Sequence, residues 1–350
     1  MDIESKSSNN DLSKESNENE DNQEEPQNNW NINYDEERKF WLKLIEKKFT
    51  YEPEICNLCK IGKFIKTENN SPNVYNPYYL RCNFNKCRKK VNLRYFSVFR
   101  LTPAIPASIM YRIIEKFIIE RSNAKEIYGY IKEHYNSNIS YENITRKIQI
   151  IRKLISEFLK IKYKETNIGG FDHNLEPHIF AIDESLFCHD SFGQIWVVGA
   201  VDTTLKNIRM DIIRNRTASN IETFINNHFK EDSHFTHDGA LWYNFLSDNI
   251  NYTHERHNHG AGDFGYGKHS TSHIEALLAE LKKEFFTIYG LIPSKNFIYF
   301  LREIEFRVII KKLNNSDKIN TLFDCIKKVY LKCDFKLSSK SELERFDNYD

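Results

Sequence analysis

Three acidic residues lie at positions where a carboxylate could bind a catalytic metal ion. Asp183 lies inside an otherwise apolar segment, Asp238 precedes a glycine at the end of a short apolar run, and Glu275 lies in the first turns of a long helical pattern. A charge inside an apolar strand is costly unless it is paired or binds a metal. Mg²⁺ prefers carboxylate oxygens, and two Mg²⁺ ions about 4 Å apart can assist both oxygens of a phosphodiester exchange. These residues therefore favour metal-dependent phosphodiester chemistry.

The spacing of these acids allows them to meet. Between Asp183 and Asp238 lie 54 residues, enough for two strands and a helix, and 36 residues separate Asp238 from Glu275. Lys282 follows Glu275 by seven residues on the same helix face, where a cation could meet a phosphate. Taken singly, each acid also has a simpler interpretation as a strand-end cap or a solvated helix residue. Their order and spacing together favour one site.

Four cysteines have the spacing of a zinc ribbon. They form the pairs Cys56-Asn-Leu-Cys59 and Cys82-Asn-Phe-Asn-Lys-Cys87. Tetrahedral Zn²⁺ takes four thiolates, and such a closed site has no open position, so we expect one structural Zn²⁺. Four free buried thiols are the alternative interpretation.

Histidines gather between the last two acids. His254, His257 and His259 lie close together in the sequence, with His269 and His273 after them. Imidazole suits Zn²⁺, so a transition-metal site, and with it a Zn²⁺-dependent hydrolase, is one interpretation. The simpler and favoured interpretation is a set of polar loop histidines beside the acidic site.

The elements that must position the acids follow from the apolar pattern after residue 177. Three strands, a helix, a fourth strand and two helices are expected, at 179–187, 195–201, 208–213, 219–229, 234–238, 241–249 and 271 to about 286. This order predicts an RNase H-like α/β core, in which helices flank a mixed sheet.

A helical region precedes this core. Two of its helices, joined by a short polar turn, suggest a helix-turn-helix whose second helix carries Arg146, Lys147 and Arg152. A plain helical linker is the alternative. The chain thus divides into a disordered acidic tail, an N-terminal helix with the zinc ribbon, the helix-turn-helix region, the RNase H-like domain and a C-terminal helical tail, at 1–35, 36–104, 105–165, 175–312 and 313–350.

Charge is distributed unevenly along the 350 residues. Residues 1–37 hold 12 acidic residues and two lysines, a polar composition that predicts disorder. Residues 60–100 hold ten Lys and Arg and one acid, which indicates a surface for a polyanion or, alternatively, an ordinary solvated surface. No apolar run approaches 18 residues and no secretory signal is present. We therefore expect a nuclear protein if the organism is eukaryotic and a cytoplasmic protein otherwise.

Several of these segments resemble one protein family. They are Ile182-Asp-Glu-Ser185, Trp196-Val-Val-Gly-Ala-Val201, Thr236-His-Asp-Gly239 with Tyr243, Asn258-His259, Thr271-Ser-His-Ile-Glu275, Lys282 and Leu301-Arg-Glu-Ile-Glu-Phe-Arg307. Over roughly residues 50–312 the chain resembles the Merlin superfamily of cut-and-paste transposases and the bacterial insertion-sequence transposases with an ISXO-like domain. The chain departs from the family pattern at Ser272 and Leu278, where Asn and Trp are frequent.

The resemblance implies a DDE-type DNA transposase that cuts transposon ends and transfers the strand into target DNA. Asp183, Asp238 and Glu275 would hold two Mg²⁺ or Mn²⁺ ions, and Lys282 would accompany them. Some relatives use Asn or His as the third ligand. The implied partners are double-stranded DNA, as terminal inverted repeats and target, and a second copy of the chain when two ends are paired.

Two other functions stay open on the sequence. The first is a catalytically inactive or host-recruited DNA-binding protein with the same fold. The second is an RNase H-like nuclease that acts on RNA or on RNA–DNA hybrids.

Overall fold

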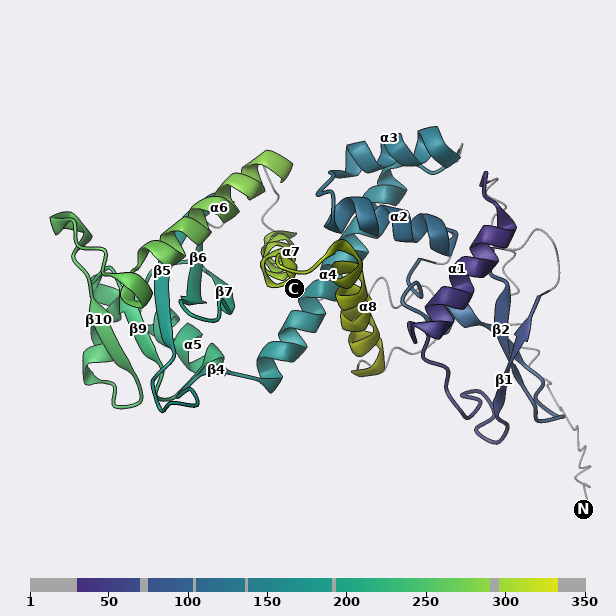
Figure 1. Ribbon diagram of the computed structural model, residues 1–350, viewed down its shortest axis with the longest axis horizontal. Helices are drawn as coiled ribbons and strands as arrows, with labels where there is room; N and C mark the ends of the chain where they lie inside the picture. Colours follow the sequence, from purple (N-terminus) through teal and green to yellow (C-terminus); the bar gives the residue numbers. More distant parts are fainter. Residues whose placement is uncertain are drawn as a thin grey trace, which may run out of the picture.

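The computed structural model describes residues 30–69, 75–102, 105–135, 138–190, 193–289 and 296–332. A five-stranded sheet with its helices lies at one end of an elongated molecule, a helical bundle lies in the middle, and a small sheet lies at the other end (Figure 1). Residues 1–29 of the expected acidic tail are outside the described residues. Helix α1 (Tyr34–Glu46) begins before the expected boundary at residue 36, and Trp30 is already buried.

The large sheet has the strand order β10-β9-β5-β6-β7. Its strands are β5 (Ile179–Asp190), β6 (Gly193–Asp202), β7 (Ile208–Ile213), β9 (His234–His237) and β10 (Thr253–Arg256). The first three strands along the chain pair antiparallel, whereas β9 pairs parallel with both β5 and β10. The sheet is therefore mixed, as expected. Strand β10 and the small strands β4 (Ile168–Gly169) and β8 (Phe229–Lys230) were not expected.

Helices cover both faces of this sheet. Successive side chains of β5 point to opposite faces of the sheet. Ala181 lies on the face that α6 (Ser272–Tyr289) and α7 (Phe297–Ile310) cover, and Ile182 lies on the face that α5 (Ala218–His228) covers. The segment Leu241–Asp248, expected as a helix, is the 3₁₀ helix η2 and packs on the α5 face.

The cysteine-rich segment forms the small sheet. Strands β1 (Phe64–Glu68), β2 (Tyr78–Cys82) and β3 (Lys90–Asn92) pair antiparallel and are followed by the 3₁₀ helix η1 (Leu93–Phe96). Next come the helices α2 (Ala107–Ile118), α3 (Ala124–Tyr135) and α4 (Tyr141–Glu165). A reciprocal capping box starts α3, because Asn123 N–H donates to Glu126 Oε2 and Glu126 N–H donates to Asn123 Oδ1, both at 3.0 Å.

The basic residues on α4 differ from the expectation of an exposed recognition helix. Lys147 and Arg152 are only 9% and 6% exposed. The Arg152 guanidinium donates to Glu303 of α7 at 2.6 Å, and Arg307 donates to the same carboxylate at 2.7 Å. The 25-residue α4 is thus a packing helix between the two ends of the molecule (Figure 1), and Lys147 and Arg152 are unavailable to DNA.

The expected C-terminal tail is also a packing element. Helix α8 (Asn315–Lys332) belongs to the same core as α2 and α4. The Phe323 ring lies 5.1 Å from Phe49, 5.6 Å from Phe99 and 6.1 Å from Tyr111, centroid to centroid. The apolar face of α8 therefore completes the helical core. None of the described helices combines the length and apolarity needed to cross a membrane.

Candidate active site

The strand register brings Asp183 and Asp238 side by side. Strands β5 and β9 pair in parallel with Ala181 opposite Thr236. Asp183 lies two residues further along β5, and Asp238 directly follows the last residue of β9, so the two acids come close enough for the charge of Asp238 to raise the pKa of Asp183. Both side chains lie on the face of Ala181, because successive side chains alternate, and this is the face that α6 covers.

A glycine lets α6 approach this position. Gly199 of β6 pairs with Asp183, and a Cβ at Gly199 would lie 3.2 Å from Ile274 Cδ1 and 3.5 Å from Leu278 Cδ2. The first turns of α6 therefore pack directly over the site, and they carry Glu275. The Glu275 carboxylate accepts a hydrogen bond from Thr271 Oγ1 at 3.3 Å.

The acids act on one another electrostatically. Burial, together with the negative charges of Asp238 and Glu275, raises the pKa of Asp183 to about 7, whereas Lys282 acts in the opposite direction. Repulsion among three carboxylates at a largely buried position is relieved by a bound cation. The oxygen donors and their shared charge thus fit a divalent metal.

A turn at Asp238 requires glycine. Gly239 has φ +80°, and a Cβ there would lie 2.2 Å from Arg256 Nε. Asp238 Oδ1 accepts a hydrogen bond from the Ala240 N–H at 2.9 Å, which orients the carboxylate. Asp238 therefore lies in the turn that directly follows β9.

Other nearby acids are occupied elsewhere. Glu184 points to the opposite face of the sheet, where it accepts hydrogen bonds from the Tyr243 hydroxyl and, at 2.9 Å, from Trp242 Nε1. Burial raises the pKa of Glu184 to about 7. On α6, Glu280 pairs with Lys311 at 3.1 Å and Glu284 pairs with Arg121 at 3.3 Å. Glu275 is thus the acid of α6 that faces Asp183.

The four cysteines converge at the other end of the molecule. All four Sγ atoms lie within 4.8 Å of one another, with Cys56 to Cys87 at 4.0 Å and Cys59 to Cys82 at 3.7 Å. A tetrahedron of Zn–S bonds has edges of about 3.8 Å, so the arrangement can hold a zinc ion. Hydrogen bonds from the Gly62 and Ile61 N–H groups lower the pKa of Cys59 to about 6. Burial raises the pKa of Cys82 to about 12.

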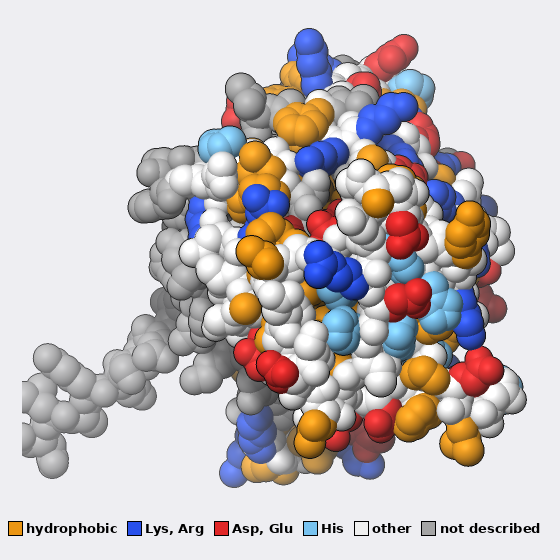
Figure 2. All heavy atoms as spheres, turned by 90° about the vertical axis from the view of Figure 1, so that its left-hand side faces the viewer, with side chains coloured by type: hydrophobic (Ala, Val, Ile, Leu, Met, Phe, Trp, Pro, Cys, Tyr) orange, Lys and Arg blue, Asp and Glu red, His pale blue; other side chains and the backbone are white. Residues whose placement is uncertain are grey.

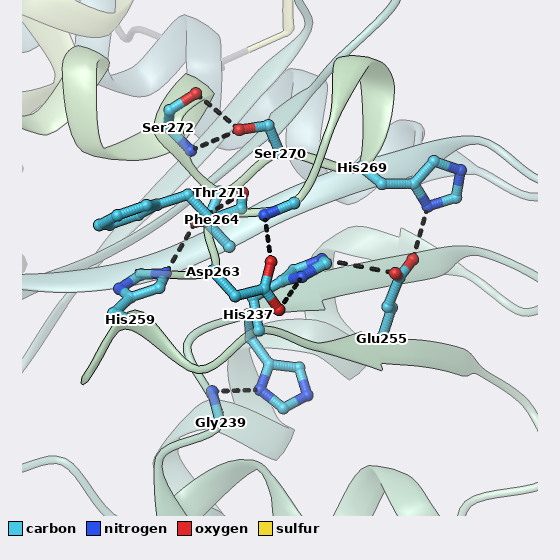
Figure 3. Close-up of polar contacts among 12 residues, drawn as sticks. His237, Gly239, Glu255, His259, Asp263, Phe264, His269, Ser270, Thr271 and Ser272 are labelled. Carbon is cyan, nitrogen blue, oxygen red and sulfur yellow. Dashed lines mark hydrogen bonds and ion pairs between the residues drawn. The ribbon is translucent and has the colours of Figure 1, made fainter. Parts of the chain in front are cut away.

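The histidines do not form one cluster. His259 is hydrogen-bonded to Thr271 Oγ1 at 2.8 Å (Figure 3). It also lies 3.5 Å from Glu275 Oε1. His254 is hydrogen-bonded to His237 at 3.1 Å. His257 instead lies beside Glu255 of β10 at 3.7 Å.

A second group was missed by the sequence. His234, Glu255 and His269 have ligand atoms within 4.8 Å of one another. His234 and Glu255 are 21 positions apart, and only the parallel pairing of β9 with β10 brings them together. In the sequence, only the strand pattern around His234 pointed to a structured position for any of the three residues.

Comparison with known proteins finds a transposase domain model that matches part of the chain. Residues 190–308 match the family model of the ISXO2-like transposase domain, a segment that includes Asp238 and Glu275 and begins after Asp183. Among solved structures, the chain is similar to a chain of the simian T-cell lymphotropic virus intasome in complex with PP2A regulatory subunit B56 gamma. That likeness has a TM-score of 0.29 and 14% identity, and it covers 58% of this chain and 69% of that chain. No curated protein matches. Residues 190–308 thus carry the likeness to the ISXO2-like transposase domain, and the resemblance expected from the motifs is confirmed over this segment.

Proposed function

We propose that this chain is a DNA transposase that cuts at transposon ends and joins the freed 3′-hydroxyl to target DNA. The observation that carries the proposal is the proximity of Asp183, Asp238 and Glu275. The charges of Asp238 and Glu275 raise the pKa of Asp183. The strand order, three antiparallel strands followed by two parallel ones, is that of an RNase H-like core and supports the same conclusion.

Each of the four site residues has a definite task in this proposal. Asp183 and Asp238 would hold two Mg²⁺ or Mn²⁺ ions from adjacent strands, with Glu275 of α6 as the third ligand. Bound there, the ions would supply activation of the attacking hydroxyl and charge neutralisation at the leaving oxygen. Lys282 would pair with a DNA phosphate.

Positioning residues support this arrangement. His259 and Thr271 contact the Glu275 carboxylate and restrict its rotamers. The rigid sheet holds the two aspartates, so little reorganisation is needed when substrate binds.

The zinc ribbon is the proposed contact with the DNA backbone. Lys86, Arg88, Lys89 and Lys90 are exposed on it, whereas Arg94 is buried and donates to the carbonyl oxygen of Thr102 at 2.6 Å. Exposed cations of this kind bind phosphates without reading sequence. Pairing of two transposon ends would bring together at least two copies of the chain.

Cleavage of the gene's own flanking DNA tests the proposal. Purified protein is incubated with a duplex that carries the flanking repeat, in Mg²⁺ or Mn²⁺, as wild type and as Asp238→Asn. We expect the variant to lose about 100-fold or more of the nicking rate, since a metal ion contributes several kcal/mol to the transition state. Glu280→Gln, on the exposed side of α6, is the matched control and should cut normally.

Three outcomes would contradict the proposal. Equal cutting by Asp238→Asn would exclude this site. Binding of the repeat without cutting by the wild type would identify a DNA-binding protein that has lost catalysis. Faster cleavage of an RNA–DNA hybrid than of duplex DNA would identify an RNase H-like nuclease.

A further inference from the structure

A group of four side chains lies at the free edge of the large sheet, apart from the three acids and from the cysteines. Glu255 of β10 stands at its centre. His269 Nδ1 lies 2.8 Å and His234 Nε2 lies 3.9 Å from Glu255 Oε2, and His257 Nε2 lies 3.7 Å from Glu255 Oε1. Figure 2 views this end of the molecule and shows histidines gathered beside acidic side chains.

The three facing nitrogens lack hydrogen bonds. Within the described part of the chain, His234 Nε2, His257 Nε2 and His269 Nδ1 are all buried and none has a hydrogen-bond partner. The His257 residue is only 4% exposed. Buried polar atoms without partners are costly, so a cluster of three requires an explanation. Short separations from a carboxylate without hydrogen-bond geometry fit nitrogens directed at a common point between them.

The remote nitrogens of two of these histidines are held in place. His234 Nδ1 is hydrogen-bonded to Thr253 Oγ1 at 2.9 Å, and His257 Nδ1 lies 3.3 Å from Asp263 Oδ2. The Gly265 N–H in turn donates to Asp263 Oδ1 at 3.0 Å. Metal-binding histidines characteristically have their second nitrogen bonded in this way to a carboxylate or hydroxyl, which fixes the tautomer.

We propose that His234, Glu255, His257 and His269 bind one Zn²⁺ ion. Three imidazoles and one carboxylate suit Zn²⁺ better than Mg²⁺ or Ca²⁺, which prefer oxygen. Zn–N bonds of about 2.0–2.1 Å give a tetrahedron with edges of about 3.4 Å, and the three separations from Glu255 lie on both sides of that value. The ligand atoms of His234, Glu255 and His269 already lie within 4.8 Å of one another, and the His257 imidazole would move toward them when the ion binds.

The local backbone leaves access to this position. Glu255, His257 and His269 line an open pocket of about 440 Å³. Gly265 packs against the site so closely that a Cβ there would lie 2.8 Å from His257 Nε2. The ion thus has an entry path, while the loop behind it is tightly packed.

Such an ion would be structural, because four protein ligands close the coordination shell. The ion would hold the loop from His257 to Thr271 against strands β9 and β10. This loop contains the 3₁₀ helices η3 (His259–Ala261) and η4 (Gly267–His269). The same loop carries His259 and Thr271, which contact Glu275. The consequence for Glu275 rests on the proposed function, whereas binding of the ion does not.

Zinc content per chain tests the proposal directly. Wild type, His269→Ala and Glu255→Ala are purified without DNA, and zinc is measured by elemental analysis. We expect each variant to hold one Zn²⁺ per chain fewer than the wild type, and any zinc in the cysteine ribbon cancels in this difference. His254→Ala, in the same strand as Glu255 but outside the group, is the control and should keep the wild-type content. Equal zinc in wild type and both variants would overturn the proposal.

A second variant keeps the test decisive if the ligand variants fail to fold. Asp263 is exposed and contacts His257 without being a ligand, so Asp263→Asn preserves the donor set. Loss of an outer-shell carboxylate weakens zinc affinity by about 10–100-fold. Competition with a chelator should show one site weakened to that extent and the ribbon site unchanged, and unchanged affinity at both sites would contradict the assignment. Neither measurement depends on DNA cleavage, so it is independent of whether the chain is an active transposase.

Discussion

At the scale of single residues, the ionisation of Asp183 sets the conditions under which the acidic site can bind metal. The side chain is largely buried, and two other carboxylates act on it, so its pKa rises from 3.8 to about 7. A carboxylic acid must lose its proton before it coordinates a cation. Metal binding and proton release are therefore linked near neutral pH.

The linkage predicts that Mn²⁺ binds more tightly as the pH rises through 7. With a pKa of about 7, Asp183 is about one-tenth ionised at pH 6 and nine-tenths ionised at pH 8, so the affinity should rise about tenfold. Calorimetric titration at both pH values measures the affinity, and buffers of different ionisation enthalpy report the released proton. In Asp183→Asn this pH dependence should disappear. Equal wild-type affinity at pH 6 and pH 8 would contradict the prediction.

At the scale of elements, the distance between α6 and the sheet determines where Glu275 lies. Gly199 is the contact point, because Ile274 and Leu278 of α6 rest against the position that a Cβ would occupy. Residue 199 also pairs with Asp183 across the strands. One glycine therefore controls how closely the helix-borne acid approaches the strand-borne acid.

Gly199→Val should separate the two. The added methyl groups push α6 outward, which costs about 1–3 kcal/mol of folding free energy and moves Glu275 from Asp183. We expect cleavage to fall much further than DNA affinity, as measured by nicking rates beside binding titrations. Gly129→Ala in α3, where a Cβ meets nothing within 4 Å, is the control and should be neutral or slightly stabilising. Normal cleavage by Gly199→Val would show that the helix position is not limiting.

At the scale of the whole molecule, α7 joins the two cores. Its Leu301 and Ile304 pack with the large sheet, whereas Phe306 and Ile310 pack with the helical bundle. The buried pairing of Glu303 with Arg152 fixes the same helix to α4 at 2.6 Å. The large sheet and the helical bundle are therefore joined through a packed interface.

Helix α8 should accordingly contribute to the stability of the whole protein. Phe323→Ala removes a fully buried ring that packs against Phe49, Phe99 and Tyr111, and we expect it to cost about 3–5 kcal/mol. Chemical denaturation of the full chain measures the difference. Leu331→Ala, at a position 62% exposed on the same helix, should change stability by less than about 0.5 kcal/mol. A small change in the free energy of unfolding for Phe323→Ala would contradict this packing role of α8.

The sequence by itself determined the features that depend on short-range pattern. Apolar periodicity located the principal strands and helices of the sheet unit, including the strand Ile208–Ile213 with its observed bounds, because burial of one face imposes that period. Spacing within a knuckle located the cysteine group. The order of the elements allowed Asp183 and Asp238 to meet, provided that their strands are neighbours, and the parallel pairing of β5 with β9 meets that condition.

The tertiary structure alone decided the features that depend on contacts between distant segments. Arg152 looks like a DNA-binding cation in the sequence, but its partner Glu303 lies 151 residues away and draws it into the core. The grouping of His234 with Glu255 depends on a parallel strand pair that no local pattern indicates. Side-chain chemistry is a local property, whereas burial and partnership are set by the packing of the whole chain.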